Sequence, residues 1–374
     1  MKRLLALDGG GIRGIFTLEI LARIEALLRE KTGRFDFVLA DYFDYIAGTS
    51  TGGIIATCLS WGMSVEMIED LYINRSMEMF CPAAWHRRWR SKFAAEAITN
   101  MMKTLFSEDG EGRVPALLRT TKLRTLLVLV MRNYSTGSPW PVSNNPAAQY
   151  NDSKSAECNL DIPLWQLVRA STAAPTYFPP ETIVLDGRRQ VFVDGGITPY
   201  NNPSLLLFLM ATLPCYKLGW ETGVDKMSLV SIGTGRERVA AGALTAERMN
   251  LLFHARSVPS SLIDSSSVQQ DMVCRVLGDC RAGGEIDSEI GDLKASGQEQ
   301  TSTRQFTYFR YDHLYTPEQI AQAEKITNSG FALDNMKLIP MLREIGAAYA
   351  AQHVRSEDFP WRPRSAEPSS AANF

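Results

Sequence analysis

Ser50 stands between two glycines in the pentapeptide Gly48-Thr49-Ser50-Thr51-Gly52. This pattern is typical of a sharp strand-to-helix turn, because a side chain at either glycine would crowd the backbone that passes close by. The turn would expose the Ser50 hydroxyl, and the helix dipole would favour the negative charge that develops during attack on a carbonyl. An ordinary turn also explains such a pentapeptide, so the elements before and after it must distinguish a nucleophilic serine from a turn serine. An apolar strand precedes it and an apolar helix follows it, which favours a nucleophilic serine.

A carboxylate that could activate this serine follows a short apolar strand at 191–193. Asp194 ends the strand, and Gly195 and Gly196 come directly after it. An aspartate at a strand end, in the same edge zone as Ser50, can accept the serine proton directly. Because a carboxylate with an ordinary pKa of about 3.9 is a poor base for an alcohol, such a Ser-Asp dyad requires a dry site and strong oxyanion stabilisation.

A glycine-rich loop near the N-terminus could supply that stabilisation. Gly9, Gly10 and Gly11 follow a short apolar strand and open a helix, so their backbone N–H groups can point at an anion. The anion could be an acyl oxyanion or a nucleotide pyrophosphate, since Gly9, Gly11 and Gly14 match the G-x-G-x-x-G pattern of dinucleotide sites. That pattern requires an acidic residue at the end of the next strand. The next strand delivers Ser50 instead, which favours the oxyanion interpretation.

Histidines offer an alternative base for the serine. The chain has four of them: His86, His254, His313 and His353. None follows a strand end or lies between glycines, but His254 and His313 come after Ser50 and Asp194 in the order that a Ser-Asp-His hydrolase uses. A triad therefore stays open as the weaker alternative.

Strands alternating with helices indicate an α/β protein. Apolar strands are expected at 3–7, 43–47, 126–131, 191–193 and 227–232, and helices are expected after Gly14, after Ser50, at 65–80, from Pro163, at 259–280 and within 317–354. Residues 133–161 are rich in Asn, Ser and Pro and predict a long surface loop. A second, polar loop is expected at 281–304, and the tail after Ser356 has the composition of a disordered segment.

Composition limits the classes of partner and compartment. The chain has 374 residues, 45% of them hydrophobic, which suffices for one large core with an appended region. A net charge of −2 argues against nucleic-acid binding. The scattered cysteines indicate reduced thiols in the cytoplasm, and they show no metal-ligand spacing, so we expect no metal or cofactor. The longest apolar run, Leu205–Leu213, is too short to cross a membrane, and the apolar start is too short for a signal peptide.

The segment Trp85–Lys92 is the most basic and aromatic part of the sequence. It can be interpreted as a patch that meets anionic lipid headgroups. A solvated loop with packed indole rings explains the same residues and is the favoured interpretation.

Three motifs stand in order along the chain: Asp8-Gly9-Gly10-Gly11-Ile12-Arg13-Gly14, Gly48-Thr49-Ser50-Thr51-Gly52 and Asp194-Gly195-Gly196. Together with the stretch Ala170–Phe178, this set resembles the patatin-like phospholipase family over about residues 1–236. The resemblance implies a three-layer α/β/α fold with a mainly parallel central sheet and a helical C-terminal extension. It also implies a Ser-Asp dyad rather than a triad.

The resemblance assigns a role to each matching position. Ser50 would be the nucleophile, Asp194 the general base, and the amides of Gly9, Gly10 and Gly11 the oxyanion hole. Arg13 fills the basic position that is usual in the family and is expected to brace that loop. The remaining motif positions would support the turns: Gly14, Gly48, Gly52, Gly195 and Gly196.

The expected activity is hydrolysis of membrane phospholipids with release of fatty acids. The finer resemblance is to bacterial effectors that a cyclic di- or trinucleotide activates in antiphage defence, acting at the inner face of the cell membrane. In this interpretation residues 1–236 are catalytic, residues 237–355 form a helical and regulatory region packed on them, and residues 356–374 are a flexible tail. A protein with a decayed site that only binds or stores lipid is the alternative from another class. The sequence leaves a homo-oligomer open.

Overall fold

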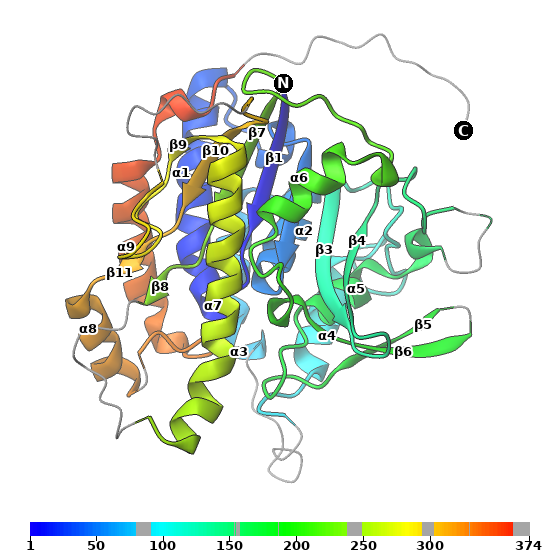
Figure 1. Cartoon of the computed structure of the whole chain (residues 1–374). Helices are drawn as coiled ribbons and strands as arrows, with labels where there is room; N and C mark the ends of the chain where they lie inside the picture. Colours follow the sequence, from blue (N-terminus) through cyan, green and yellow to red (C-terminus); the bar gives the residue numbers. More distant parts are fainter. Residues whose placement is uncertain are drawn as a thin grey trace.

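One mixed β-sheet forms the centre of the molecule (Figure 1). The computed structural model describes residues 1–79, 91–152, 154, 158–185, 187–237, 249–293, 303–328 and 330–361. The sheet order is β5-β6-β3-β2-β1-β7-β10-β9, with β4 paired to β3 on its other edge. Its strands are β1 Lys2–Leu7, β2 Tyr45–Thr49, β3 Leu126–Asn133, β4 Ser138–Ser143, β5 Glu181–Leu185, β6 Arg188–Asp194, β7 Met227–Ile232, β9 Asp279–Ala282 and β10 Thr307–Tyr311. A small separate sheet pairs β8 Arg236–Glu237 with β11 Leu314–Tyr315.

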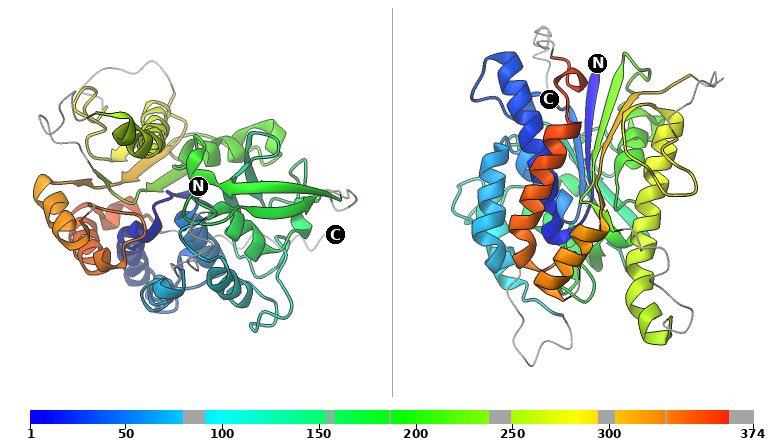
Figure 2. Two further views of the ribbon diagram at one scale, coloured as in Figure 1. Left: turned by 90° about the horizontal axis from the view of Figure 1, so that it is seen from below. Right: turned by 90° about the vertical axis from the view of Figure 1, so that its left-hand side faces the viewer.

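Helices cover both faces of the sheet, as the right panel of Figure 2 shows for α1 and α9 on one side and α7 on the other. The two faces follow from alternation along β1: Leu5 and Leu7 join the core beneath α1, whereas Leu4 and Ala6 join the core beneath α6. The three-layer α/β/α architecture is therefore confirmed. The helices are α1 Gly14–Thr32, α2 Thr51–Ser60, α3 Val65–Met79, α4 Glu96–Leu105, α5 Leu164–Ser171, α6 Ser204–Thr212, α7 Leu251–Leu277, α8 Pro317–Thr327 and α9 Ile339–His353.

The expected long loop after β3 is wrong in part. Its residues 138–143 form β4, which pairs antiparallel with β3, and β6 also runs antiparallel to β3. The sheet is thus parallel from β3 through β2, β1, β7 and β10 to β9, and β4, β5 and β6 add antiparallel pairs beyond β3. Alternating Pro and Trp in β4 hid the strand, since proline is depleted in strands and occurs chiefly at sheet edges.

The C-terminal region holds the expected helices α7, α8 and α9 and also strands that the sequence analysis did not predict, among them β9 and β10. β10 pairs parallel with β7, and β9 pairs with β10, so this region completes the central sheet. β9 replaces the end of the helix expected at 259–280 and the start of the polar loop expected at 281–304, since α7 ends at Leu277. The sheet thus joins the chain before and after residue 237 into one structure.

The aromatic and basic segment falls outside the described residues except for Ser91 and Lys92. The expectation of a flexible tail from residue 356 is wrong at its start: Ser356–Asp358 form a short 3-10 helix, and Phe359 is buried because its ring packs on Tyr42 and Phe309. The tail beyond Trp361 falls outside the described residues. Within the parts of the chain that are described, no helix is both long and apolar enough to cross a membrane.

Candidate active site

The turn at Ser50 has the backbone that the two glycines predict. Ser50 has φ 55° and ψ −124°, a positive-φ conformation that non-glycine residues seldom adopt, and α2 begins at the next residue. A β-carbon at Gly48 would lie 2.1 Å from the carbonyl oxygen of Gly52, and one at Gly52 would lie 2.3 Å from that of Leu7. The two glycines therefore let the backbone segments on either side of Ser50 pack closely, and this packing holds the serine in its strained conformation.

The register of β3 brings the serine and the aspartate together. β2 pairs with β3 up to Thr49, opposite Val130, and β6 takes over the same edge of β3 with Asp194 opposite Met131. Ser50 and Asp194 are therefore neighbours although 144 residues separate them in sequence. The Ser50 hydroxyl donates a hydrogen bond of 2.6 Å to Oδ2 of Asp194. This contact is the one that direct proton transfer requires.

Asp194 is only 4% exposed and is held on three sides. Its Oδ1 accepts a 2.6 Å bond from the Gly196 N–H, and its own N–H donates to the carbonyl oxygen of Ala173. Burial raises the pKa of Asp194 to about 6, although the bonds from Ser50 and Gly196 lower it. A carboxylate with this pKa is a stronger base than an ordinary aspartate and is still ionised at neutral pH.

The glycine loop lies beside the serine, but its three amides are not equivalent. The Gly9 N–H donates to the carbonyl oxygen of Asn201, so this amide is not free to bind an oxyanion as expected, and an oxyanion hole at Gly10 and Gly11 stays a prediction. The N–H groups of Gly10 and Gly11 have no acceptor within the described residues. A β-carbon at Gly9 would lie 3.2 Å from that of Ser50, which places the start of the loop against the serine.

A family model described as patatin-like phospholipase matches residues 5–208. The chain belongs to the patatin-like phospholipase family. It is 36% identical over 215 residues to a cGAMP-activated phospholipase of Vibrio cholerae, covering 54% of this chain and 56% of that protein. It is 32% identical over 286 residues to a cGAMP-activated phospholipase of Escherichia coli, covering 74% and 76%. A probable inactive patatin of Solanum tuberosum is 28% identical over 294 residues, covering 71% and 73%.

In this patatin-like chain two residues of the C-terminal region also hold the glycine loop. Arg310, on β10, makes two bonds of 3.0 and 2.7 Å to the carboxylate of Asp8, and all but 3% of its side chain is buried. The carbonyl oxygen of Leu333 accepts the Ile12 N–H at 2.7 Å. Gly11, with φ 58°, packs so closely that a β-carbon would lie 2.2 Å from that same oxygen. The loop is therefore fixed at both ends by residues from beyond position 300.

Arg13 and Gly14 connect the loop to the helices behind it. The Arg13 N–H closes a turn on the Gly10 carbonyl oxygen, and its side-chain Nε has no hydrogen-bond partner within the described part of the chain. A β-carbon at Gly14 would lie 2.3 Å from the methyl group of Thr51, so α1 and α2 start in contact. The bracing role of Arg13 remains a prediction.

Two further positions near the dyad were missed by the sequence analysis. Ser171, which lies in the stretch of small residues, accepts the Ser50 N–H at 3.0 Å and donates to the Val130 carbonyl oxygen at 2.6 Å. It ties the serine turn to β3. The sequence did contain a signal for Ser171, because a hydroxyl among closely packed alanines needs a buried hydrogen-bond partner.

Arg169 is the second missed position. It is 1% exposed, lies on α5 and donates to the Pro179 carbonyl oxygen, while its Nε and Nη1 have no partner in the described residues. Its charge lowers the pKa of Asp194, although less than burial raises it. Only the fold could reveal this cation, since 25 residues separate Arg169 from the aspartate in sequence.

The histidines of the described residues lie away from the dyad. His313 bonds through Nε2 to Gln319 and stacks with Phe16, and His254 contacts Phe253. His353 packs on Tyr349. His86 falls outside the described residues. The arrangement therefore favours the dyad over the triad.

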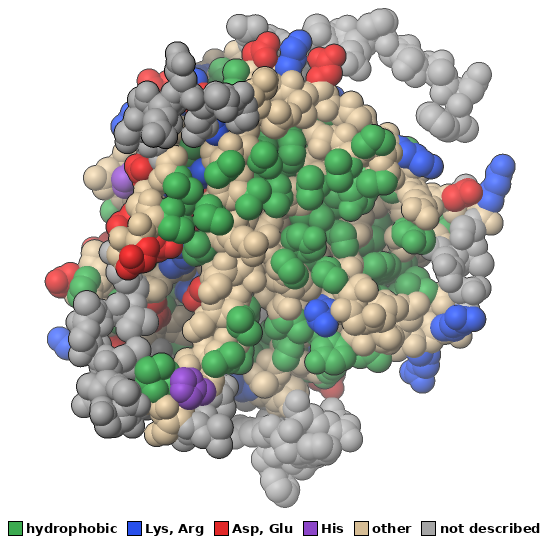
Figure 3. All heavy atoms as spheres, in the orientation of Figure 1, with side chains coloured by type: hydrophobic (Ala, Val, Ile, Leu, Met, Phe, Trp, Pro, Cys, Tyr) green, Lys and Arg blue, Asp and Glu red, His purple; other side chains and the backbone are tan. Residues whose placement is uncertain are grey.

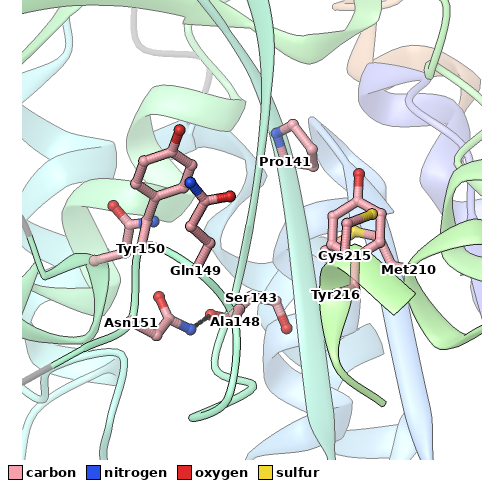
Figure 4. Close-up of a pocket in the computed structure, with 10 residues that line it drawn as sticks. Pro141, Ser143, Ala148, Gln149, Tyr150, Asn151, Met210, Cys215 and Tyr216 are labelled. Atoms are coloured by element: carbon pink, nitrogen blue, oxygen red, sulfur yellow. Dashed lines mark hydrogen bonds between the residues drawn. The ribbon is translucent and has the colours of Figure 1, made fainter. Parts of the chain in front are cut away.

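A cavity of about 240 Å³ lies elsewhere, between β4, the following loop and the end of α6 (Figure 4). Tyr150 and Gln149 border it from the loop, and Met210, Cys215 and Tyr216 border it on the side of α6. None of the predicted catalytic residues lines this cavity.

Proposed function

We propose that this chain is a lipid acyl hydrolase of the phospholipase A type. The observation that carries the proposal is the 2.6 Å bond between Ser50 and a buried Asp194, beside the free amides of Gly10 and Gly11. Family membership and the activity named for the bacterial relatives support it.

Each group has a step in this reaction. Asp194 accepts the Ser50 proton as the serine oxygen attacks the acyl carbonyl, and the amides of Gly10 and Gly11 bind the oxyanion that forms. Protonated Asp194 then donates to the departing alcohol oxygen of the lysophospholipid, which leaves an acyl ester on Ser50. Water, deprotonated by the same carboxylate, hydrolyses the ester and releases the fatty acid. General-base action contributes about 10²–10⁴-fold, and each oxyanion donor about 10²–10³-fold.

We further propose that a cyclic di- or trinucleotide activates the enzyme at the inner face of the cytoplasmic membrane in antiphage defence. Two bacterial relatives are named for activation by cGAMP, which supports a nucleotide. Residues 237–355 are proposed to be the regulatory region, because Arg310 and Leu333 from this region hold the glycine loop. A shift of either contact would alter the positions of the oxyanion amides.

The test is mass spectrometry of phospholipid vesicles incubated with the protein, with and without cyclic di- and trinucleotides. We expect nucleotide-dependent release of fatty acid and lysophospholipid. A fluorophosphonate probe should label the parent protein and not Ser50→Ala, whereas Ser138→Ala, which changes an exposed serine on β4, should label as the parent does. Full activity without nucleotide would refute the activation. Absence of labelling would favour the ligand-binding alternative, and loss of activity in His313→Gln would favour the triad.

A further inference from the structure

Asn201 holds the first glycine of the loop through both its backbone and its side chain. Its carbonyl oxygen accepts the Gly9 N–H at 3.1 Å, and its side-chain Nδ2 donates a longer bond of 3.4 Å to the Gly9 carbonyl oxygen. Asn201 is buried, so these bonds form away from bulk solvent. One residue therefore engages both polar backbone groups of Gly9 and sets the direction in which the chain enters Gly10 and Gly11.

The carboxamide of Asn201 also lies between the glycine loop and the dyad. A β-carbon at Gly9 would lie 2.5 Å from its Oδ1 and 3.2 Å from the β-carbon of Ser50. A β-carbon at Gly196 would lie 3.2 Å from the same Oδ1 and 3.1 Å from Oδ1 of Asp194. The side chain therefore packs against the start of the loop and against the residue that binds the base. A change in its position would move the loop amides relative to the serine.

The carboxamide is anchored in turn by Ser267, on α7. Nδ2 of Asn201 donates a 3.1 Å bond to the Ser267 hydroxyl oxygen. The Ser267 hydroxyl donates its own proton to the carbonyl oxygen of Ile263, one turn earlier, so its oxygen is left to accept. Asn202 donates a second bond, of 3.3 Å, from its side chain to the Ser267 carbonyl oxygen. Ser267 thus accepts a bond from each of two consecutive asparagines.

α7 carries Ser267 on its inner side. The helix lies on the face turned toward the viewer in Figure 1 and packs against β9, β10 and residues 195–197. The outer surface of this face shows few charged side chains away from its margins (Figure 3). Ser267 is only 5% exposed, so its bond with Asn201 is shielded from water. A hydrogen bond shielded in this way is electrostatically stronger than one at the surface and holds its partners more firmly.

The contact at Gly9 acts directly beside the two amides that are free. Gly10 and Gly11 lie between the Asn201 contact at Gly9 and the contact of Leu333 with the residue after Gly11. Donors to an oxyanion are effective because they are fixed before the charge develops. The contact that fixes the residue before Gly10 should therefore affect the rate of the chemical step.

We propose that Asn201 is a positioning residue, anchored by Ser267 of α7, that fixes Gly9 so that the amides of Gly10 and Gly11 face the carbonyl attacked by Ser50. This inference rests on the proposed function and adds to it two residues that position the oxyanion amides. Ser267 lies beyond residues 5–208, the segment that the family model matches. The bond between Ser267 and Asn201 connects α7 to the candidate active site.

The test compares two serines of α7 in the full-length protein. Ser267→Ala removes the acceptor of the Asn201 bond. Ser257→Ala is the matched control, because the Ser257 hydroxyl also donates to the carbonyl oxygen four residues earlier, that of Phe253. Alanine favours a helix, so both variants should fold, and Tm is measured to check this. Activity is measured on a soluble short-chain ester with cGAMP present, the nucleotide for which the bacterial relatives are named.

We expect Ser267→Ala to lower kcat and kcat/KM equally, by about tenfold, because the loop amides act on the transition state. A fatty-acyl trifluoromethyl ketone should inhibit this variant about tenfold more weakly, since its hemiketal with Ser50 places an oxyanion against the same amides. Asn201→Ala removes both side-chain bonds and should lower kcat by about 100-fold. Ser257→Ala should match the parent protein in rate and in inhibition by the ketone.

Two results would overturn the positioning role. One is equal kcat and equal ketone inhibition in Ser267→Ala and Ser257→Ala. The other is a lower Tm in Ser267→Ala with a raised KM and an unchanged kcat, which would limit the bond to a structural role. If the parent protein hydrolyses neither the soluble ester nor phospholipid vesicles, the proposed function fails and this inference fails with it. An active parent whose two serine variants do not differ refutes this inference alone.

Discussion

The serine turn and the glycine loop adjoin one another, yet different parts of the chain hold them. The turn depends on contacts within residues 1–236: the packing of Gly48 on Gly52, the bond to Ser171 and the bond to Asp194. The loop depends on such contacts too, with Thr51 and Asn201, but it also needs Arg310 and Leu333 from beyond residue 300. Strand register thus places Ser50 beside Asp194, whereas the position of the Gly10 and Gly11 amides also depends on the C-terminal region.

The largest expected effect tests the first half of this contrast. Asp194→Asn keeps the shape of the side chain but removes the proton acceptor, so we expect kcat to fall by about 10²–10⁴-fold. The measurement is the rate of fatty-acid release, with Tm measured to confirm folding. More than a tenth of the parent rate in a folded variant would exclude Asp194 as the base.

The second half of the contrast is tested by Arg310→Met. The change leaves the Asp8 carboxylate buried without its cation, which should reduce the free energy of unfolding by about 3–5 kcal/mol. Arg275→Met is the control, because Arg275 is equally buried and its carboxylate partner, Asp271, makes no hydrogen bond to the glycine loop among the described residues. Both variants should have a lower Tm than the parent protein. At a temperature at which both are folded, only Arg310→Met should also have a lower kcat, by more than about tenfold. Equal kcat values in the two variants would show that the Arg310 contact does not position the glycine loop for catalysis.

A smaller effect sharpens the description of the serine turn. Ser171→Ala leaves the Ser50 N–H and the Val130 carbonyl oxygen without their shared partner, at a cost of about 1–3 kcal/mol. We expect kcat to fall about tenfold, since the turn loosens around the nucleophile. Ser143→Ala removes a comparable buried bond, to Tyr45, and should leave kcat unchanged. A loss of stability with no loss of kcat would limit Ser171 to a structural role.

The smallest effect concerns the pH at which the base is ionised. Because the pKa of Asp194 is raised to about 6, kcat/KM should fall as pH decreases through about 6, where the carboxylate becomes protonated. Arg169→Met removes a nearby positive charge, so the pKa of Asp194 should rise and the acid limb should move to higher pH. Arg169→Lys should restore the parent profile. If the acid limb of the kcat/KM profile stays at the same pH in Arg169→Met, then the charge of Arg169 does not affect the pKa of Asp194.

The sequence predicts the residues of the dyad because glycine spacing and strand ends are local signals. It also predicts the boundaries of α1 and β7 closely, since a glycine with positive φ ends the first and a fully buried apolar run forms the second. It could not predict β10, whose residues Thr307–Tyr311 mix polar and aromatic side chains. It likewise assigned the Gly9 amide to the oxyanion hole, because no local pattern shows that the carbonyl oxygen of Asn201 reaches it.

The contact between Arg310 and Asp8 spans 302 positions of the chain. During synthesis on the ribosome, Asp8 emerges long before its cation, and the Gly11 turn waits still longer for Leu333. A nascent chain therefore contains the residues of its serine turn well before it contains all the residues that hold its glycine loop. The glycine loop can therefore take its final contacts only after residue 333 has been synthesised.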